Sequence, residues 1–327
     1  MTIVITGAAG QDGILLARKL IKQGKHVFGL CRKTQCDYLK KMAPGLNVVG
    51  VDLTDFSKLY RILNNLRPIK IFNLAGYSSV SKSWVEPSSM SLVNSVLPTH
   101  ILSWIVKESP ATQIIQASSS EIFGNTLDFP QSENTELKPV TPYGLAKSFA
   151  LQMTEIFRDF SKVQATNLIL YNHESPLRAQ EFVTRHITRS VAKIKLGFED
   201  KIVIGNISMK RDWGWAPDYV DGMILASEYP KSDNFIFATG KMHSVEDLLV
   251  MAFNVVGIHE FSKYIVESRE IVRKIDPQSL VGNPKKAENI LGWKRSLNLE
   301  QIIKTMVVFD LAELTSGKKI EWIDGND

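Results

Sequence analysis

From residue 3 to about residue 170, short apolar runs alternate with longer stretches in which apolar residues recur with helical spacing. The short runs predict buried strands, and the longer stretches predict amphipathic helices. Strands are expected at 3–6, 26–30, 49–55, 70–76, 113–118 and 165–170, and helices at 14–20, 91–106 and 143–160. This alternation is typical of a parallel sheet covered by helices. We therefore expect an α/β fold with a doubly wound parallel sheet.

After residue 170 the pattern loosens and predicts a smaller, mostly C-terminal lobe. Helices are expected at 182–197, 245–256 and 299–314, a strand that returns to the sheet at 234–240, and a polar tail at 316–327. We divide the chain accordingly into a sheet domain and a second domain. The sheet domain comprises residues 1–170 plus about 212–240, and the second domain comprises residues 171–211 plus 241–327.

The composition is that of a globular protein, and it limits the kinds of molecule that the protein is expected to bind. Of the 327 residues, 44% are hydrophobic and 22% are charged, which allows a sizeable core. The formal net charge of +5 includes no long cationic run, so nucleic-acid binding is not indicated, whereas a mild positive bias suits anionic nucleotides. Cys31, Cys36 and the histidines lack metal-binding spacing, so neither a metal site nor a disulfide framework is expected. We expect no signal peptide, no apolar run of membrane length and a cytoplasmic protein.

Three glycines follow the first strand at the spacing of a dinucleotide-binding turn. Gly7, Gly10 and Gly13 stand between the run 3–6 and the helix 14–20. In this context the first glycine permits a tight turn, the second admits a pyrophosphate, and the third lets the helix pack closely on the sheet. The N–H groups at the helix start would bind the diphosphate. The pattern predicts a Rossmann sheet that binds a nicotinamide cofactor.

The end of the second strand indicates which dinucleotide binds. An acidic residue there usually binds the ribose hydroxyls of NAD, but this chain has Arg32 and Lys33. Two cations suit a 2′-phosphate, so we predict NADP; the alternative is a solvated loop pair. Asp52, after the third strand, could lie near the adenine. Cys31 is expected at the mouth of this site and is expected to be unreactive.

The run 116–121 and the later residues Tyr143 and Lys147 carry the candidate chemistry. Tyr143 and Lys147 are four positions apart, on one face of a predicted helix. A lysine cation beside a phenol lowers the pKa of the phenol, which would make Tyr143 a base for a sugar hydroxyl. Glu121 is a second base, which is needed when a reaction also removes a carbon-bound proton. The alternative for Glu121 is a structural acid on the turn after the strand.

With these motifs the chain resembles the extended short-chain dehydrogenase/reductases and, within them, the GDP-mannose 4,6-dehydratases. The similarity covers nearly the whole chain, in the runs TGAAGQDG (6–13), QASSSE (116–121), NHESP (172–176), FVTR (182–185), RDWG (211–214), DYV (218–220) and LGW (291–293). The runs GQDG and NHESP are specific to the dehydratases, whereas the Tyr-x-x-x-Lys and Ser-Ser-Glu patterns also occur in sugar epimerases, decarboxylases and reductases. The resemblance implies a hydro-lyase of deoxysugar biosynthesis, with an NADP-binding sheet domain and a second domain that binds the nucleotide-sugar.

The resemblance also implies a reaction, from GDP-mannose to GDP-4-keto-6-deoxymannose by internal hydride transfer. Tyr143 would take the proton of the C4 hydroxyl while hydride leaves C4 for NADP⁺, with Ser119 bonded to O4 and Lys147 holding the cofactor ribose. Glu121 would remove the C5 proton as water leaves C6, and the hydride would return to C6. The implied cofactor contacts are Gly7, Gly10, Gln11, Asp12, Gly13, Arg32, Asp52, Leu53, Leu74, Lys147 and Arg178. The implied substrate contacts are Ser78, Ser83, Asn172, Glu174, His186, Arg211, Arg273 and Asp276.

The chain departs from the family pattern at several of these positions. Ser119 replaces a threonine, and Ser79 replaces a histidine that usually follows Ser78. His186 replaces a lysine, and Asp276 replaces a glutamate. The sugar and the base therefore stay open, and the alternatives are a GDP-heptose 4,6-dehydratase, a GDP-4-keto-6-deoxy-sugar reductase and a non-catalytic NADP-binding protein.

A further departure concerns assembly. The loop after the second strand, which helps to build a tetramer in relatives, is cut short here. We therefore expect a homodimer through the helices at 91–106 and 143–160, with a tetramer as the alternative.

Overall fold

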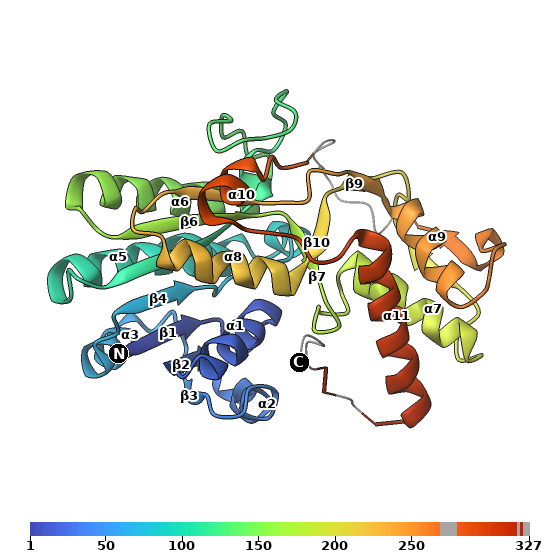
Figure 1. The fold of residues 1–327 in the computed structure, drawn as a ribbon, viewed down its shortest axis with the longest axis horizontal. Helices are drawn as coiled ribbons and strands as arrows, with labels where there is room; N and C mark the ends of the chain where they lie inside the picture. Colours follow the sequence, from blue (N-terminus) through green and yellow to red (C-terminus); the bar gives the residue numbers. More distant parts are fainter. Residues whose placement is uncertain (269–279, 319–320, 323–327) are drawn as a thin grey trace.

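Seven parallel strands form the central sheet of the protein, as predicted (Figure 1). The computed structural model describes residues 1–268, 280–318 and 321–322. The strand order is β11-β6-β5-β4-β1-β2-β3. The strands are β1 (Thr2–Thr6), β2 (His26–Cys31), β3 (Asn47–Gly50), β4 (Lys70–Asn73), β5 (Gln113–Ser119), β6 (Ala165–Leu170) and β11 (Asn234–Phe237). The predicted return of the chain to the sheet is confirmed, because β11 pairs in parallel with β6.

Helices cover both faces of this sheet, because successive strand residues point to opposite faces and both are apolar. Ile3 and Ile5 belong to the core beneath α1, α2, α8 and α10, whereas Val4 belongs to the core beneath α3 and α5. The first group comprises α1 (Gln11–Lys22), α2 (Cys36–Met42), α8 (Ala216–Glu228) and α10 (Lys285–Leu291). The second group comprises α3 (Phe56–Leu66) and α5 (Leu97–Glu108), and α6 (Pro142–Ser161) packs beside α5. This two-faced covering is the doubly wound arrangement that the sequence pattern predicts.

A second lobe packs beside the carboxyl ends of the strands (Figure 1). Its core lies between α7 (Val183–Lys195), α9 (Val245–Val255) and α11 (Leu299–Ser316). Three pairs of short strands accompany these helices: β7 (Asn172–Glu174) with β10 (Trp213–Trp215), β9 (Lys210–Arg211) with β12 (His243–Ser244), and β8 (Ile202–Ile204) with β13 (Ile265–Glu267). The chain runs from β1 to β2 on one side and returns to β4 on the other, which creates a crevice at the strand ends where ligands bind in such sheets.

The helix predicted at 91–106 is longer than expected and is interrupted. It consists of α4 (Pro87–Ser91), a π-helical segment (Leu92–Val96) and α5. Within the described residues, the stretch Pro87–Glu108 is the one helix long and apolar enough to cross a membrane by length and composition, so the expectation of no such run is wrong. Its apolar residues Ile101 and Leu102 are buried in the core that contains Val4. Packing against the sheet accounts for its apolar character.

Glu321 and Trp322 lie within the polar tail predicted at 316–327, and both contact the sheet domain. Trp322 is only 8% exposed, and its ring contacts that of Trp215 edge-on, with centroids 5.4 Å apart. The carbonyl of Trp322 accepts a hydrogen bond of 2.6 Å from Arg18 of α1, and Glu321 pairs with Lys41 at 3.4 Å. One aromatic residue in a polar segment thus anchors the C-terminal segment to the sheet domain.

Replacing Trp322 by Ala should therefore lower the free energy of unfolding by about 3 kcal/mol, the low end for removal of a buried tryptophan, since a chain end can relax. Urea unfolding followed by circular dichroism measures this change. Phe198→Ala is the matched control, because Phe198 is 63% exposed and its removal should change stability by less than about 0.5 kcal/mol. Equal, small effects of both substitutions would show that the C-terminal segment is not anchored.

Candidate functional site

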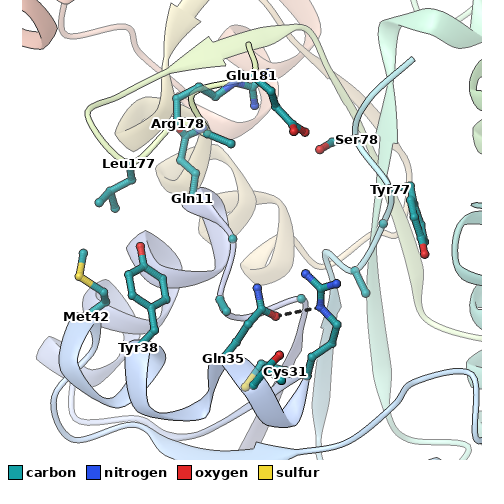
Figure 2. Close-up of a pocket in the computed structure, with 18 of the residues that line it drawn as sticks. Gln11, Cys31, Gln35, Tyr38, Met42, Tyr77, Ser78, Leu177, Arg178 and Glu181 are labelled. Atoms are coloured by element: carbon teal, nitrogen blue, oxygen red, sulfur yellow. Dashed lines mark hydrogen bonds between the residues drawn. The ribbon is translucent and has the colours of Figure 1, made fainter. Parts of the chain in front are cut away.

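Two connected cavities lie at the carboxyl ends of the sheet strands. The larger has a volume of about 1780 Å³ and the smaller of about 640 Å³. They share a set of lining residues, namely Gly76, Tyr77, Ser78, Ser79, Arg178, Glu181 and Phe182. Figure 2 shows the larger cavity, with Arg178 and Glu181 on one side and Gln35 and Cys31 on the other. The cavities are therefore continuous past the segment that follows β4.

The glycine turn after β1 leaves no room for side chains. Gly7 has a φ of 67°, and a Cβ atom there would lie 2.7 Å from the backbone of Ala75. A Cβ atom on Gly13 would lie 2.6 Å from Ala8 Cα, so Gly13 sits beneath the turn and lets α1 approach it. Gly10 is the N-cap of α1 and provides no side-chain cap. An uncapped helix N-terminus that faces a cavity suits a phosphate group.

The far end of the larger cavity combines cations with one carboxylate. Arg32 and Lys33, which follow β2, line it together with Asp52 and Leu53. The Asp52 carboxylate accepts hydrogen bonds from the backbone and hydroxyl of Thr54 at 2.9 and 2.8 Å, which lower its pKa. This cavity could hold a dinucleotide, with the diphosphate at Gly10 and the adenosine end at Arg32 and Asp52.

A partly buried ion pair lies at the first turn of α1. The Asp12 carboxylate is 3.0 Å from Nε2 of His173, whose Nδ1 is 2.7 Å from the Tyr171 carbonyl. Burial alone would raise the pKa of Asp12, but the charge of His173 and its hydrogen bond lower it overall. The same pairing with Asp12 outweighs burial at His173 and raises its pKa. The positive charge of His173 therefore offsets the negative charge of Asp12, which would otherwise repel a phosphate bound at the N-terminus of α1.

The four candidate catalytic residues come together in the smaller cavity. Ser119 ends β5, Glu121 lies in the turn that follows, and Tyr143 and Lys147 lie on the first turns of α6. All four side chains are buried and line this cavity. The structure thus brings together in one cavity four residues from separate elements that the sequence pattern had grouped.

Helix α6 can approach the end of β5 because the residue that follows Tyr143 is a glycine and has no side chain. A Cβ atom on Gly144 would lie 2.5 Å from the Glu121 carbonyl oxygen. Thr141 caps the helix by accepting from the Gly144 N–H at 3.0 Å, and Pro142 occupies the first turn. Gly144 therefore brings Tyr143 to Ser119 and Glu121, a role that the sequence analysis missed.

Burial, rather than the charge of Lys147, makes the largest contribution to the pKa shift of Tyr143. Burial raises the pKa of Tyr143 to about 12, a hydrogen bond with Ser119 lowers it, and the charge of Glu121 raises it further. Burial also lowers the pKa of Lys147 to about 8. Lys147, which was expected to lower the pKa of Tyr143, is not among the largest contributions to the shift of Tyr143, and its Nζ donates to the Ala117 carbonyl at 2.9 Å. Arg178 is the cation whose charge lowers the pKa of Tyr143.

Asn94 is a second residue that the sequence analysis missed. It is buried in the π-helical segment, and its side-chain amide accepts from the Tyr77 N–H at 2.9 Å and donates to the Tyr77 carbonyl at 3.0 Å. A Cβ atom on Gly76 would lie 3.0 Å from Asn94 Oδ1 and 3.4 Å from Lys147 Nζ. Asn94 therefore fixes the segment at the junction of the two cavities, close to Lys147. A lone asparagine in an apolar helix carries no local signal of this position.

Arg178 is held between the two cavities by residues of the second lobe. Its Nε lies 3.3 Å from Glu174 Oε2, and its guanidinium stacks 3.7 Å above the Phe182 ring. Glu174 is buried and also accepts a hydrogen bond from Thr184. Glu174 thus orients Arg178 as well as lining the smaller cavity.

Most of the other predicted contacts line one cavity or the other. Ser78 lines both cavities, Gln11 lines the larger one, and the smaller one is lined by Asp12, Leu74, Asn172, His186 and Arg211. His186 Nε2 is 2.9 Å from the Val203 carbonyl. Ser83 lines neither cavity, because its hydroxyl is buried and donates to the Val80 carbonyl at 2.6 Å. Arg273 and Asp276 lie outside the described residues.

The second lobe adds lining residues to the smaller cavity that the sequence did not suggest. They are Val203, Ile204, Gly205, Asn206, Met209, Trp213 and Val245. Among the described residues, no group of three or more His, Cys, Asp or Glu side chains is arranged to hold a metal ion.

Comparisons with known proteins show which family the chain belongs to. The sequence profile of the family described as GDP-mannose 4,6 dehydratase matches residues 4–306. GDP-mannose 4,6 dehydratase 1 of Arabidopsis thaliana is 34% identical, over 97% of this chain and 91% of that protein. GDP-mannose 4,6-dehydratase of Vibrio cholerae is also 34% identical, over 96% of this chain and 94% of that protein.

Solved structures support the fold. UDP-glucose 4-epimerase of Thermotoga maritima, solved with UDP-glucose, superposes with a TM-score of 0.85 at 26% identity, over 97% of this chain and all of that chain. dTDP-glucose 4,6-dehydratase of Bacillus anthracis, solved with NAD, superposes with a TM-score of 0.82 at 17% identity, over 96% of this chain and 98% of that chain. The resemblance inferred from the motifs is confirmed: the chain belongs to the GDP-mannose 4,6-dehydratase family, with the fold of the extended short-chain dehydrogenase/reductases.

Proposed function

We propose that this protein converts GDP-mannose to GDP-4-keto-6-deoxymannose, using NADP(H) that it recycles within each turnover. The observation that carries the proposal is the convergence of Ser119, Glu121, Tyr143 and Lys147 in one buried cavity, in a member of this family. That cavity continues into the one at the glycine turn. The nicotinamide supplies the redox chemistry, accepting hydride from C4 and returning it to C6.

Tyr143 and Ser119 are assigned to the C4 oxygen of the sugar. The hydrogen bond between them aligns the phenol, and Ser119 also accepts from the Glu121 N–H at 3.3 Å. With its pKa near 12, Tyr143 is protonated at neutral pH, so it needs nearby positive charge to accept the C4 proton. Arg178 provides part of that charge. Lys147 has a pKa near 8, so it can gain or lose a proton close to neutral pH. We assign to Lys147 the role of exchanging this proton with Tyr143.

Glu121 is assigned to the C5 proton. It is buried, it lines the same cavity as Tyr143, and its charge acts on Tyr143, which supports the proposal that the two groups serve neighbouring carbons of one sugar ring. Oxidation at C4 makes the adjacent C5–H acidic, and a positioned carboxylate can then remove this proton as water leaves C6. Two bases in one cavity distinguish this arrangement from one that only oxidises an alcohol.

The cofactor and nucleotide contacts complete the proposal. Arg32 and Lys33 would bind the 2′-phosphate of NADP, since a guanidinium binds phosphate through two N–H groups. Asn172, His186 and Arg211 would bind the nucleotide of the substrate in the second lobe. We accordingly propose that residues 1–170 plus about 212–240 form the NADP-binding domain, and that residues 171–211 plus 241–327 form the substrate domain. Cytoplasmic localisation stays a prediction.

An exposed apolar stripe on α6 supports the proposed homodimer. Leu145, Phe149, Ile156 and Phe160 are 62%, 45%, 49% and 82% exposed, and their spacing places them along one face of the helix. Helix α5 packs beside α6 and adds exposed Val106. Exposed apolar side chains gathered on one face of a helix are typical of a protein interface.

The C5 base is tested by comparing two variants with GDP-mannose and NADP⁺. Glu121→Gln should lower dehydration by about 10²–10⁴-fold, the usual contribution of one general base, and should still form the 4-keto sugar at C4. Tyr143→Phe should suppress both steps. The 4-keto-6-deoxy product is measured by its absorbance in alkali, and C4 oxidation by the absorbance of reduced nicotinamide in single turnovers. Parent-rate dehydration by Glu121→Gln would refute the assignment, and net consumption of NADPH would indicate a reductase.

Cofactor choice is tested by Arg32→Ala. The dissociation constant for NADP⁺ should rise by roughly 10–100-fold, the loss expected of a charge-assisted hydrogen bond, with little change for NAD⁺. Binding is measured by isothermal titration calorimetry. Arg61→Ala on exposed α3 is the control and should change neither constant. An equal loss of affinity for both dinucleotides would contradict a 2′-phosphate contact.

The dimer is tested by the double substitution Phe149→Glu and Phe160→Glu. Carboxylates in an apolar interface are costly to bury, so the particle mass in light scattering should fall to that of one chain. Phe198→Glu, an exposed aromatic on the second lobe, is the control and should leave the mass unchanged. A parent protein that already has the mass of one chain would rule the dimer out.

A further inference from the structure

The only two cysteines of the chain face each other at the adenosine end of the larger cavity. Cys31 is the last residue of β2, and Cys36 is the first residue of α2. Their Sγ atoms are 3.7 Å apart, and both are free thiols. Figure 2 places Cys31 next to Gln35 on the wall of this cavity. The pair therefore flanks the loop that carries Arg32 and Lys33.

The geometry lets the two sulfurs approach one another. Bonded sulfurs lie about 2.0 Å apart, so the Sγ atoms would have to move together by roughly 1.7 Å. A Cβ atom on Gly50 would lie 2.8 Å from Cys36 Sγ, so this sulfur lies close against the backbone of β3, on the Cys31 side of the helix. Between the cysteines is a short 3₁₀ turn (Lys33–Gln35), the element that would absorb the movement.

The two thiols differ in access. Cys31 is 3% exposed, whereas Cys36 is half-buried, so an oxidant from solvent reaches Cys36 first. Burial, aided by the neighbouring Cys36, raises the pKa of Cys31 to about 12, which keeps Cys31 a thiol in the reduced protein. This order of access suits a pair in which one cysteine reacts and the other resolves the product.

We propose that Cys31 and Cys36 form a reversible intramolecular disulfide, a redox modification site that changes the cofactor cavity. With hydrogen peroxide as the oxidant, the Cys36 sulfur attacks one oxygen, the O–O bond breaks, and a sulfenic acid and water form. The Cys31 sulfur then attacks the Cys36 sulfur, the S–S bond forms, the S–O bond breaks, and the Cys31 thiol proton joins the departing hydroxide as a second water. Two electrons pass from the two sulfurs to the peroxide, and a dithiol reductant reverses the change by thiol–disulfide exchange.

The disulfide would disturb the residues that line the cavity between the cysteines. The Cys36 thiol donates to the Arg32 carbonyl at 3.8 Å, and Arg32 Nε donates to Gln35 Oε1 at 3.3 Å. Oxidation removes the thiol donor and draws the start of α2 towards β2, so the Arg32 side chain loses its present support. The effect on NADP rests on the proposed function, in which Arg32 binds the 2′-phosphate. Formation of the disulfide itself does not.

The test treats the whole protein with hydrogen peroxide and then maps peptides by mass spectrometry without reduction. The expected result is a single cross-link between the peptides of Cys31 and Cys36, loss of both titratable thiols, and loss of two hydrogens in mass. The dissociation constant for NADP⁺ should rise by about tenfold or more, as expected when one charge-assisted contact is lost. Dithiothreitol should restore both the thiols and the affinity. Cys36→Ser should bind NADP⁺ as the reduced parent does and should not respond to peroxide.

Two results would overturn the proposal. One is the persistence of both thiols, or their pairing between chains, after peroxide has oxidised exposed methionines. The other is a complete intramolecular disulfide that leaves cofactor affinity within about twofold of the reduced protein. If Arg32 does not select NADP, Arg32→Ala will not weaken NADP⁺ binding selectively, but the mass-spectrometric mapping of the thiols will be unaffected. The two proposals can therefore fail separately.

Discussion

The close approach of helix α6 to the end of strand β5 is the constraint on which the site depends. Gly144 makes it possible, because any side chain there would collide with the Glu121 carbonyl. The approach sets Tyr143 beside Ser119, and one turn later it lets Lys147 reach the carbonyl of Ala117 on the same strand. A helix cap and a proline fix where the helix begins, so local backbone chemistry determines the placement of the phenol.

The same packing removes these groups from water, and burial then sets their acidities. Tyr143 is driven towards its neutral form and so is Lys147, with pKa values that move in opposite directions. The pair of Asp12 and His173 behaves differently, since each partner offsets the desolvation of the other and keeps the charged form. The site is thus divided into one end where burial favours the neutral forms of Tyr143 and Lys147 beside the charged Glu121, and an ion-paired end at the helix start, with Arg178 between them.

The predictable part of the site consists of residues whose role depends on near neighbours in the chain. The glycines of the first turn and the cations after β2 could be recognised from spacing alone, and Gly7, Gly10, Arg32 and Lys33 line the larger cavity. Ser83, which was expected among the substrate contacts, lies outside both cavities, and its hydroxyl donates to the Val80 carbonyl within its own turn. Asn94 was overlooked for the opposite reason, since its importance comes from contacts with a segment that the helical pattern does not reveal.

By itself the sequence determined the doubly wound sheet, the dinucleotide turn and the family, because each depends on periodicity or on motifs of neighbouring residues. Only the tertiary structure showed that Trp322 anchors the C-terminal segment, that the two sulfurs face each other, and that Lys147 bonds to a carbonyl and leaves the acidity of Tyr143 to burial. These properties arise from contacts between segments far apart in the chain or from the direction of a side chain. The spacing of residues in the sequence shows neither which distant segments touch nor which groups lose contact with water, so only the tertiary structure determines both.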